Sequence, residues 1–177
     1  MKYYHGSQNG NLTKLSLDKS VDGYVYLTPD YNFAVLYAGS LLRFWKYDFE
    51  QQKLIIREVV KDGLKKMYKN KPCYIYSTEE LGEHEEMDVM GRKTVRMQHD
   101  VELTDKQYIP DAYEKIIELY NQGKIIIWFW EDYSEEQKIK VKQNVIDKFK
   151  PHMEEFKEKF KPNYDLVVEL FPELEID

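Results

Sequence analysis

Residues 23–38 read GYVYLTPDYNFAVLYA, and this stretch decides the fold. Its opening segment alternates along the chain and is rich in aromatic and β-branched side chains, which predicts a strand. Thr28 is then expected to cap a helix, because the proline that follows suits the first helical position and Asp30 suits the first turn. Apolar side chains follow at helical spacing: Phe33, Ala34, Leu36 and Tyr37. The sequence therefore predicts a strand that runs directly into a helix ending at Gly39.

A second element opens the chain. Residues 2–5, KYYH, predict a short strand, and the chain continues with Gly6 and Ser7. A histidine at a strand end can offer a ring nitrogen to a ribose hydroxyl, and a glycine backbone can pair with an amide because no side chain stands in the way. Tyr26 and Tyr37 can hold a flat aromatic ring between them. A primary carboxamide on an aromatic ring beside a ribose describes nicotinamide attached to its sugar.

The remaining pattern mixes strands and helices without internal repeats. Alternating or apolar segments predict further strands at 41–49, 53–60, 73–78, 94–103 and 124–130. Helical spacing predicts a capped helix at 111–123 and a weaker helix or loop at 62–70. The end of the chain is all helical and begins with a capping-box pattern at Ser134. We expect an α+β fold with a strand-rich part, 1–130, and a helical appendage, 131–177, packed on it.

The composition narrows the class of protein. With 177 residues, 42% hydrophobic and 33% charged, the chain can build a folded core. Its net charge of −6 makes nucleic-acid binding a less favoured function, because proteins that bind nucleic acids usually carry a basic surface patch. The single cysteine, Cys73, cannot form an internal disulfide, and no segment has the length and apolar character of a signal peptide or a membrane span. We therefore expect a cytoplasmic protein with no membrane partner.

The two N-terminal elements resemble the first two motifs of the ADP-ribosyltransferase superfamily, in the branch typified by diphtheria-type toxins and poly(ADP-ribose) polymerases. That family carries His-Gly-Ser/Thr at the end of its first strand, and HGS stands here at 5–7. It then carries I-Y-x-(A/T)-D-x-x-x-(S/A)-x-x-Y, which the stretch 23–38 resembles. The resemblance extends loosely over 2–125, as expected for a divergent, bacterial-type member of the His-Tyr-Glu kind.

The resemblance implies a split, mostly antiparallel β-sandwich around a cleft for NAD. It implies that His5 binds the adenosine ribose, that the Gly6 backbone holds the nicotinamide carboxamide and that Ser7 assists at the amide. The two tyrosine rings of the second motif would stack on nicotinamide. On this basis we expect the following residues to bind the cofactor: His5, Gly6, Ser7, Tyr26, Ala34, Tyr37 and, from a late strand, Gln98.

The family's third motif is a carboxylate on a late strand. It holds the ribose 2′-hydroxyl and stabilises the positive charge that develops as nicotinamide leaves. The polar face of the predicted strand 94–103 offers Gln98, Asp100 and Glu102 for this position. Glu102 is preferred as the catalytic residue because it is the right residue type. Asp100, one methylene shorter, stays open, and Gln98 carries no charge.

These expectations describe an NAD-dependent enzyme that cleaves the nicotinamide–ribose bond and transfers ADP-ribose to an unidentified acceptor or to water. Among acceptors, a protein is favoured over nucleic acid. The alternative is a non-catalytic nucleotide-binding or protein-interaction module that keeps the fold. The acidic stretch 79–88 contains His84 but lacks the two-histidine spacing of a helical metal site. We expect it to be an exposed loop or short helix, and we expect no metal site.

Overall fold

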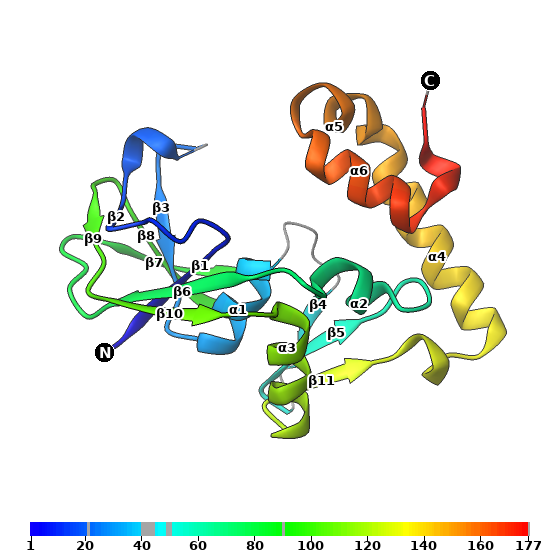
Figure 1. Cartoon of the computed structure of the whole chain (residues 1–177), viewed down its shortest axis with the longest axis horizontal. Helices are drawn as coiled ribbons and strands as arrows, with labels where there is room; N and C mark the ends of the chain where they lie inside the picture. Colours follow the sequence, from blue (N-terminus) through cyan, green and yellow to red (C-terminus); the bar gives the residue numbers. More distant parts are fainter. Residues whose placement is uncertain (21, 40–44, 49–50, 90, 177) are drawn as a thin grey trace.

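The computed structural model describes residues 1–20, 22–39, 45–48, 51–89 and 91–176. It is a mixed α and β structure with mostly antiparallel sheets, which lie on one side of the molecule, and the C-terminal helices lie on the other (Figure 1). The start and the last residue of the predicted strand 41–49 lie outside the described residues. No helix in the described ranges is long and apolar enough to cross a membrane.

The central sheet has the strand order β1–β6–β10. It is built from β1 (Tyr3–Ser7), β6 (Cys73–Thr78) and β10 (Asp105–Ile109), all antiparallel to their neighbours. Strands β1 and β6 match predicted segments, whereas β10 was not predicted because its exposed polar residues show little hydrophobic alternation. Strand β1 ends at Ser7, two residues later than predicted, so the HGS motif forms the last three residues of the strand, all of them paired with β6.

A second antiparallel sheet has the order β3–β8–β7. It consists of β3 (Val25–Leu27), β8 (Arg92–Met97) and β7 (Glu85–Val89). One face covers a small core together with the two-stranded sheet of β2 (Lys14–Leu15) and β9 (Val101–Glu102). The buried members of this core are Leu15, Val25, Leu27, Leu81, Val95, Met97 and Val101. Because side chains alternate along a strand, the opposite face carries Tyr26, Thr94 and Met87.

The third sheet has the order β11–β5–β4. Strand β5 (Lys53–Arg57) pairs antiparallel with β4 (Trp45–Asp48) and parallel with β11 (Ile125–Trp128). The buried carboxylate of Glu58 closes the end of this sheet, where its two oxygens accept hydrogen bonds from the backbone N–H groups of Leu64 and Trp130, each at 2.9 Å. One side chain thus joins β5, the following helix and the end of β11.

Helix α1 (Tyr31–Gly39) packs directly against β1. Its cap is Asp30, whose Oδ1 accepts hydrogen bonds from the N–H groups of Asn32 at 2.9 Å and Phe33 at 3.4 Å. Thr28, predicted as the cap, instead accepts from the N–H of Asp30 at 3.1 Å and donates to the Lys93 carbonyl at 2.8 Å. The prediction of Thr28 as the cap was therefore wrong, because the proline lies before the helix and not inside it.

The other helices follow the predicted signals closely. They are α2 (Gly63–Tyr68), α3 (Ala112–Asn121), α4 (Glu135–Phe149), α5 (Met153–Lys159) and α6 (Lys161–Leu170). Short 3₁₀ turns lie at Leu17–Lys19, Trp130–Asp132, Lys150–His152 and Pro172–Leu174. The predicted cap at Ser134 is confirmed, since its hydroxyl accepts from the N–H of Gln137 at 3.2 Å and the Gln137 side chain accepts from the N–H of Ser134 at 2.9 Å.

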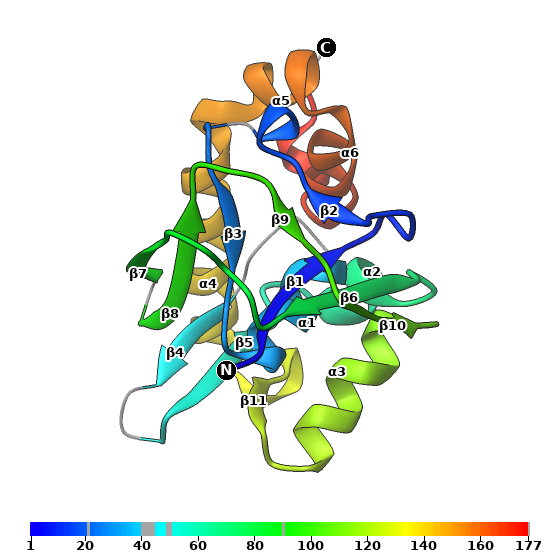
Figure 2. The same ribbon diagram turned by 90° about the vertical axis from the view of Figure 1, so that its left-hand side faces the viewer.

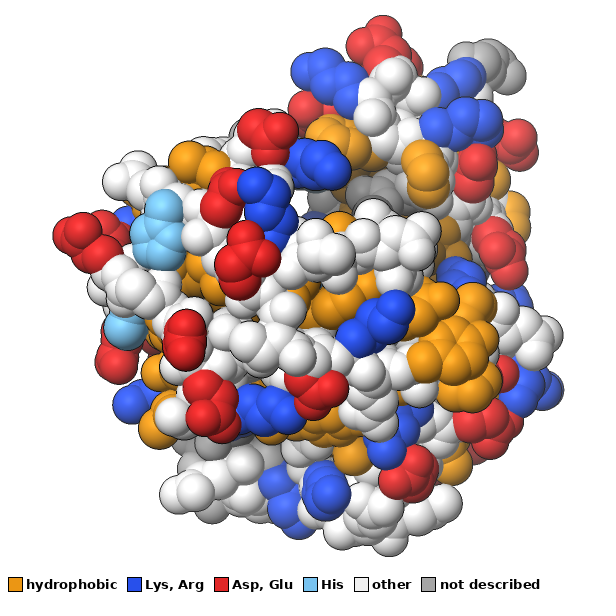
Figure 3. All heavy atoms as spheres, turned by 60° about the vertical axis from the view of Figure 1, so that its left-hand side comes forward, with side chains coloured by type: hydrophobic (Ala, Val, Ile, Leu, Met, Phe, Trp, Pro, Cys, Tyr) orange, Lys and Arg blue, Asp and Glu red, His pale blue; other side chains and the backbone are white. Residues whose placement is uncertain are grey.

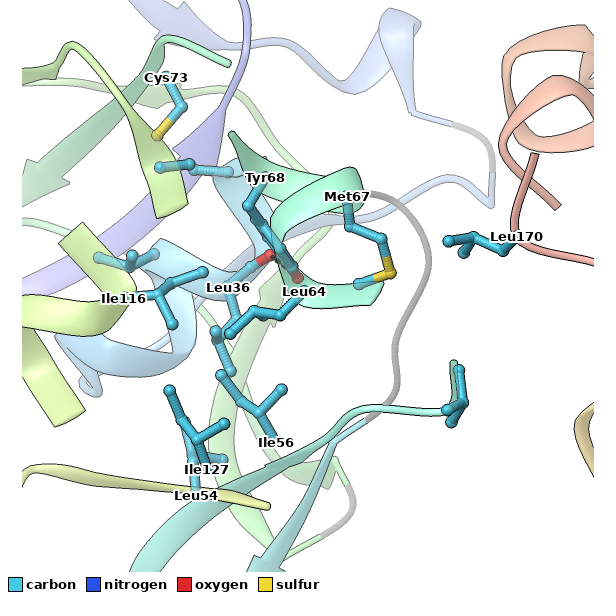
Figure 4. Close-up of a cluster of buried hydrophobic side chains, with 14 of the residues drawn as sticks. Leu36, Leu54, Ile56, Leu64, Met67, Tyr68, Cys73, Ile116, Ile127 and Leu170 are labelled. Atoms are coloured by element: carbon cyan, nitrogen blue, oxygen red, sulfur yellow. Dashed lines mark hydrogen bonds between the residues drawn. The ribbon is translucent and has the colours of Figure 1, made fainter. Parts of the chain in front are cut away.

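The helical end of the chain shares the main apolar core with the strand-rich part. Val167, Leu170 and Phe171 are buried in the same cluster as side chains of α1, α2, α3, β5 and β11. Figure 4 shows Leu170 of α6 pointing toward Met67 of α2. An ion pair between Lys142 and Glu173, at 2.7 Å, further joins α4 to the turn after α6.

Two predicted segments differ from the structure. The segment 94–103 is not one strand, because residues 98–100 turn between β8 and β9. There both ring nitrogens of His99 lie 2.8 Å from backbone carbonyls, those of Glu83 and Asp100, and these bonds raise the pKa of His99. The acidic stretch 79–88 is not wholly loop or helix either, since β7 begins at Glu85, where alternate side chains turn toward the sheet face.

Candidate functional site

A cavity lies where β1 and β3 separate. Tyr4 and Thr28 exchange two backbone hydrogen bonds, with N···O distances of 2.7 and 3.0 Å, and tie the two strands together at one point. From there β1 pairs with β6 while β3 pairs with β8, so the strands form a V in Figure 2. The space between them is a cavity of about 470 Å³, which we call the fork cavity. Its walls come from β1, β3, α1, β7 and β8.

Five of the residues predicted to bind a cofactor line this cavity. They are His5, Gly6, Tyr26, Ala34 and Tyr37. They come from three elements, β1, β3 and α1, which the Tyr4–Thr28 bridge and the packing of α1 on β1 bring together. Their roles toward a cofactor stay predictions.

His5 spans the fork. Its Nδ1 lies 3.1 Å from the backbone carbonyl oxygen of Tyr26. Because a carbonyl only accepts, Nδ1 donates this hydrogen bond, and Nε2 of the neutral ring is left as an acceptor. Burial lowers the pKa of His5, which favours the neutral ring at neutral pH. The side chain can therefore accept a hydrogen bond from a ligand hydroxyl.

Gly6 presents its backbone to the cavity. The backbone N–H and C=O of Tyr4 both point toward β3, where they bond to Thr28. Every second residue of a strand directs its N–H and C=O to the same edge of the strand, so those of Gly6 share the edge of Tyr4. The N–H and C=O of Gly6 therefore point into the fork, where β3 has already diverged. A Cβ atom at this position would lie 2.1 Å from the Ala34 carbonyl oxygen, so only glycine lets α1 approach β1 this closely.

Aromatic rings form much of the remaining wall. On α1, Phe33 and Tyr37 lie one turn apart with their ring centroids 4.8 Å from each other in an edge-to-face arrangement. On β3, the Tyr26 hydroxyl donates a hydrogen bond to the carboxylate of Asp22, which also lines the cavity. This bond is the main cause that lowers the pKa of Asp22 and raises the pKa of Tyr26. Asp22 is thus a charged residue of the site.

The sequence did not single out Asp22. It stands in a turn before the strand, at a spacing that no motif marks. Its position four residues before Tyr26 could have indicated a contact between the two side chains, but only once the start of β3 at Val25 is known. A short bend then brings the carboxylate back over the tyrosine hydroxyl.

The other predicted site residues lie outside the fork cavity. Ser7 accepts a hydrogen bond from the N–H of Asn9 at 3.1 Å, within a turn, and Gln98 is exposed. Asp100 forms an ion pair with Lys14 at 2.6 Å and accepts from the N–H of Leu17 at 2.9 Å. Glu102 is exposed on β9. None of these residues is among those that line the cavity. For the late-strand candidates the cause is the turn at 98–100, which carries β9 away from β3 to pair with β2.

A second hollow of about 430 Å³ adjoins the fork cavity. The two share His5, Asp22 and Tyr26. The second hollow adds two lysines, Lys14 and Lys19, and two hydroxyls, from Ser16 and Ser20. The combined space therefore has an aromatic end and a more basic, hydroxyl-lined end, and the Asp22 carboxylate borders both.

Neither a metal centre nor a reactive thiol is found in the part of the chain that the structure describes. No group of three or more His, Cys, Asp or Glu side chains there could hold a metal ion. Cys73 is buried in β6, and burial raises its pKa to about 11. The thiol therefore stays protonated at neutral pH and is a poor nucleophile.

Comparisons of the chain with protein-family models, with curated proteins and with solved structures found no match.

Proposed function

We propose that the chain binds NAD with the nicotinamide end in the fork cavity and cleaves the nicotinamide–ribose bond, as ADP-ribosyltransferases do. The ADP-ribose would pass to a protein acceptor or to water. The observation that carries the proposal is that His5, Gly6, Tyr26 and Tyr37 line one cavity.

The polar groups of the cavity suit nicotinamide riboside. A primary carboxamide offers one acceptor and two donors, which can pair with the backbone N–H and C=O of Gly6. The Nε2 of His5 can accept from a ribose hydroxyl, since Nδ1 is already used toward Tyr26. The rings of Tyr26 and Tyr37 give a flat heterocycle two aromatic faces to pack against.

Cleavage needs a negative group near the ribose. As nicotinamide leaves with the electrons of the C–N bond, positive charge develops on the sugar, and a fixed carboxylate lowers the energy of that state. Asp22 is the carboxylate among the described residues that line the fork cavity, and its lowered pKa keeps it charged. In this proposal Asp22 supplies that charge in place of Glu102 or Asp100.

The second hollow suits the phosphates of the dinucleotide. Lys19 forms no ion pair with a residue that the structure describes, and the hydroxyl of Ser16 lies in the same hollow, whereas the hydroxyl of Ser20 is already used toward Asp22. Lys14, by contrast, is partly compensated by Asp100. On the face drawn in Figure 3, basic and acidic side chains are intermixed, which favours a protein acceptor or water over nucleic acid.

A second candidate function is binding of NAD or a related nucleotide without turnover. It is favoured by the positions of Asp100 and Glu102, which lie outside the fork cavity. The Asp22 carboxylate is also occupied by the Tyr26 hydroxyl, which reduces the charge that it presents to a ligand.

The two candidates are separated by measuring NAD binding by calorimetry and nicotinamide release by chromatography on the same protein. We expect release by the wild type, and a loss of at least about tenfold in His5→Ala and Tyr37→Ala. Tyr108→Ala is the matched control, since this tyrosine is 55% exposed on β10 and lies outside the cavity. Binding without release would select the second candidate, and no binding would contradict both.

A further inference from the structure

The fork cavity combines aromatic walls with a fixed negative charge. The aromatic side chains that line it are Tyr4, Tyr26, Phe33 and Tyr37. Asp22 is the one charged side chain among the described residues that line it, and no lysine or arginine is among them. His5 adds no positive charge at neutral pH, because burial lowers its pKa. The lining therefore carries a net negative charge.

Hydrogen bonds hold the Asp22 carboxylate in place at the edge of the cavity. It accepts from the hydroxyl of Tyr26, from the hydroxyl of Ser20 at 3.0 Å and from the N–H of Tyr24 at 3.2 Å. These donors favour the charged form and lower the pKa of Asp22. The charge is thus fixed beside one of the rings that line the cavity.

The cations nearest to this wall are compensated by acids. Arg96 lies opposite Tyr26 across the β3–β8 pair, and its guanidinium is 2.6 Å from a Glu85 oxygen. Arg92, on the same face of β8, forms an ion pair with Asp30. Lys14 and Lys19 line the second hollow, which Asp22 also borders, but neither lysine forms an ion pair with Asp22. The negative charge of Asp22 is therefore not neutralised from within the cavity.

We propose that Asp22 makes the fork cavity selective for a flat aromatic cation, so that it binds the positively charged pyridinium of oxidised NAD in preference to the neutral dihydropyridine of NADH. Aromatic faces attract cations, and a carboxylate beside them adds a Coulombic attraction. The identity of the ligand rests on the proposed function, whereas the charge selectivity is a property of the cavity lining alone.

A pair of small probes tests the selectivity. 1-Methylnicotinamide is a cation, and nicotinamide is its neutral counterpart with the same carboxamide and ring. By calorimetry at neutral pH and low salt, we expect the wild type to bind the cation about tenfold more tightly. In Asp22→Asn, which keeps an acceptor for the Tyr26 hydroxyl, the two affinities should agree to within about twofold, with that for nicotinamide unchanged.

Asp105→Asn is the control, because it removes the same charge from an exposed site on β10 that does not line the cavity, and it should keep the wild-type preference. Equal binding of the probes by the wild type, no binding of the cation at millimolar concentration, or a preference that persists in Asp22→Asn would overturn the inference.

A third arm compares NAD with NADH. Selective binding of 1-methylnicotinamide without NAD binding would remove the proposed function alone, and equal binding of NAD and NADH would remove the charge selectivity alone.

Discussion

His5 donates a hydrogen bond from Nδ1 to the backbone carbonyl of Tyr26, at 3.1 Å, across the gap where β1 and β3 separate. The bond replaces the ladder hydrogen bonds that the diverging strands no longer make at this place. It also fixes the orientation of the ring, so that Nε2 remains as the acceptor. The His5 side chain therefore both links β1 to β3 and leaves an acceptor nitrogen for a ligand.

The first prediction concerns pH. Burial lowers the pKa of His5 in the folded chain, whereas in the unfolded chain it has the ordinary value of about 6.5. As the pH falls, the unfolded state takes up the proton first, so the free energy of unfolding decreases from about pH 6.5 down to the lowered pKa. The wild type should therefore lose stability relative to His5→Gln, measured by urea unfolding between about pH 7 and 5.

His99 is present in both of these proteins, so its own contribution cancels in the comparison. That contribution has the opposite sign, because backbone hydrogen bonds raise the pKa of His99. A stability difference that stays constant over the range would show that His5 is not shielded from protonation.

The second prediction concerns the contact between β1 and α1. In Gly6→Ala the new Cβ would meet the Ala34 carbonyl oxygen at 2.1 Å, which forces the helix away from the strand. We expect the free energy of unfolding to fall by about 3 kcal/mol, as for overpacking of a tight interior. Gly63→Ala is the control, since its nearest neighbour is a side-chain methyl at 3.2 Å. Equal effects of the two changes on the denaturation midpoint would disprove the close approach.

The third prediction concerns the carboxylate that closes the third sheet. Glu58 is 5% exposed and accepts from the N–H groups of Leu64 and Trp130. In Glu58→Gln one acceptor becomes an amide NH₂ that faces a backbone N–H, so we expect a loss of about 2 kcal/mol. Glu86→Gln, at an exposed position on β7, should change the free energy of unfolding by less than about 0.5 kcal/mol. A Glu58→Gln variant as stable as wild type would show that the two Glu58 oxygens do not both accept backbone hydrogen bonds.

The fourth prediction concerns the helical end of the chain. Leu170 is 4% exposed and lies in the main apolar core, whereas Ile139 on α4 is 72% exposed. Leu170→Ala should lower the free energy of unfolding by about 3 kcal/mol, and Ile139→Ala by less than about 0.5 kcal/mol. Both can be measured by thermal and urea unfolding. A single transition should be seen in each case, and a small loss in Leu170→Ala would show that α6 does not share the core.

Local chemistry predicted much of the fold, including β1, β3 and α1 of the fork. The strand–helix stretch 23–38, the strand 73–78 and the capped helices at 111–123 and after Ser134 each carry their own signals of alternation, capping residues or helical spacing. The cap of α1 was misplaced by two residues, because Thr28 and Asp30 are both good caps and only the tertiary bond of Thr28 to Lys93 distinguishes them.

Contacts distant in sequence decided what could not be predicted. Strict alternation over 94–103 suggested one strand, but the bonds of His99 to Glu83 and Asp100 turn the chain there. That turn carries Asp100 and Glu102 out of the fork cavity. Asp22 enters the site through a bend before β3, which leaves no periodic pattern in the sequence.

The most direct measurement is a crystal structure of the chain with NAD. The account predicts the nicotinamide ring between Tyr26 and Tyr37, its carboxamide on the backbone of Gly6, and a ribose hydroxyl within hydrogen-bond distance of His5 Nε2. A nicotinamide ring bound anywhere outside the fork cavity, or a fork cavity that stays empty at saturating NAD, would contradict it.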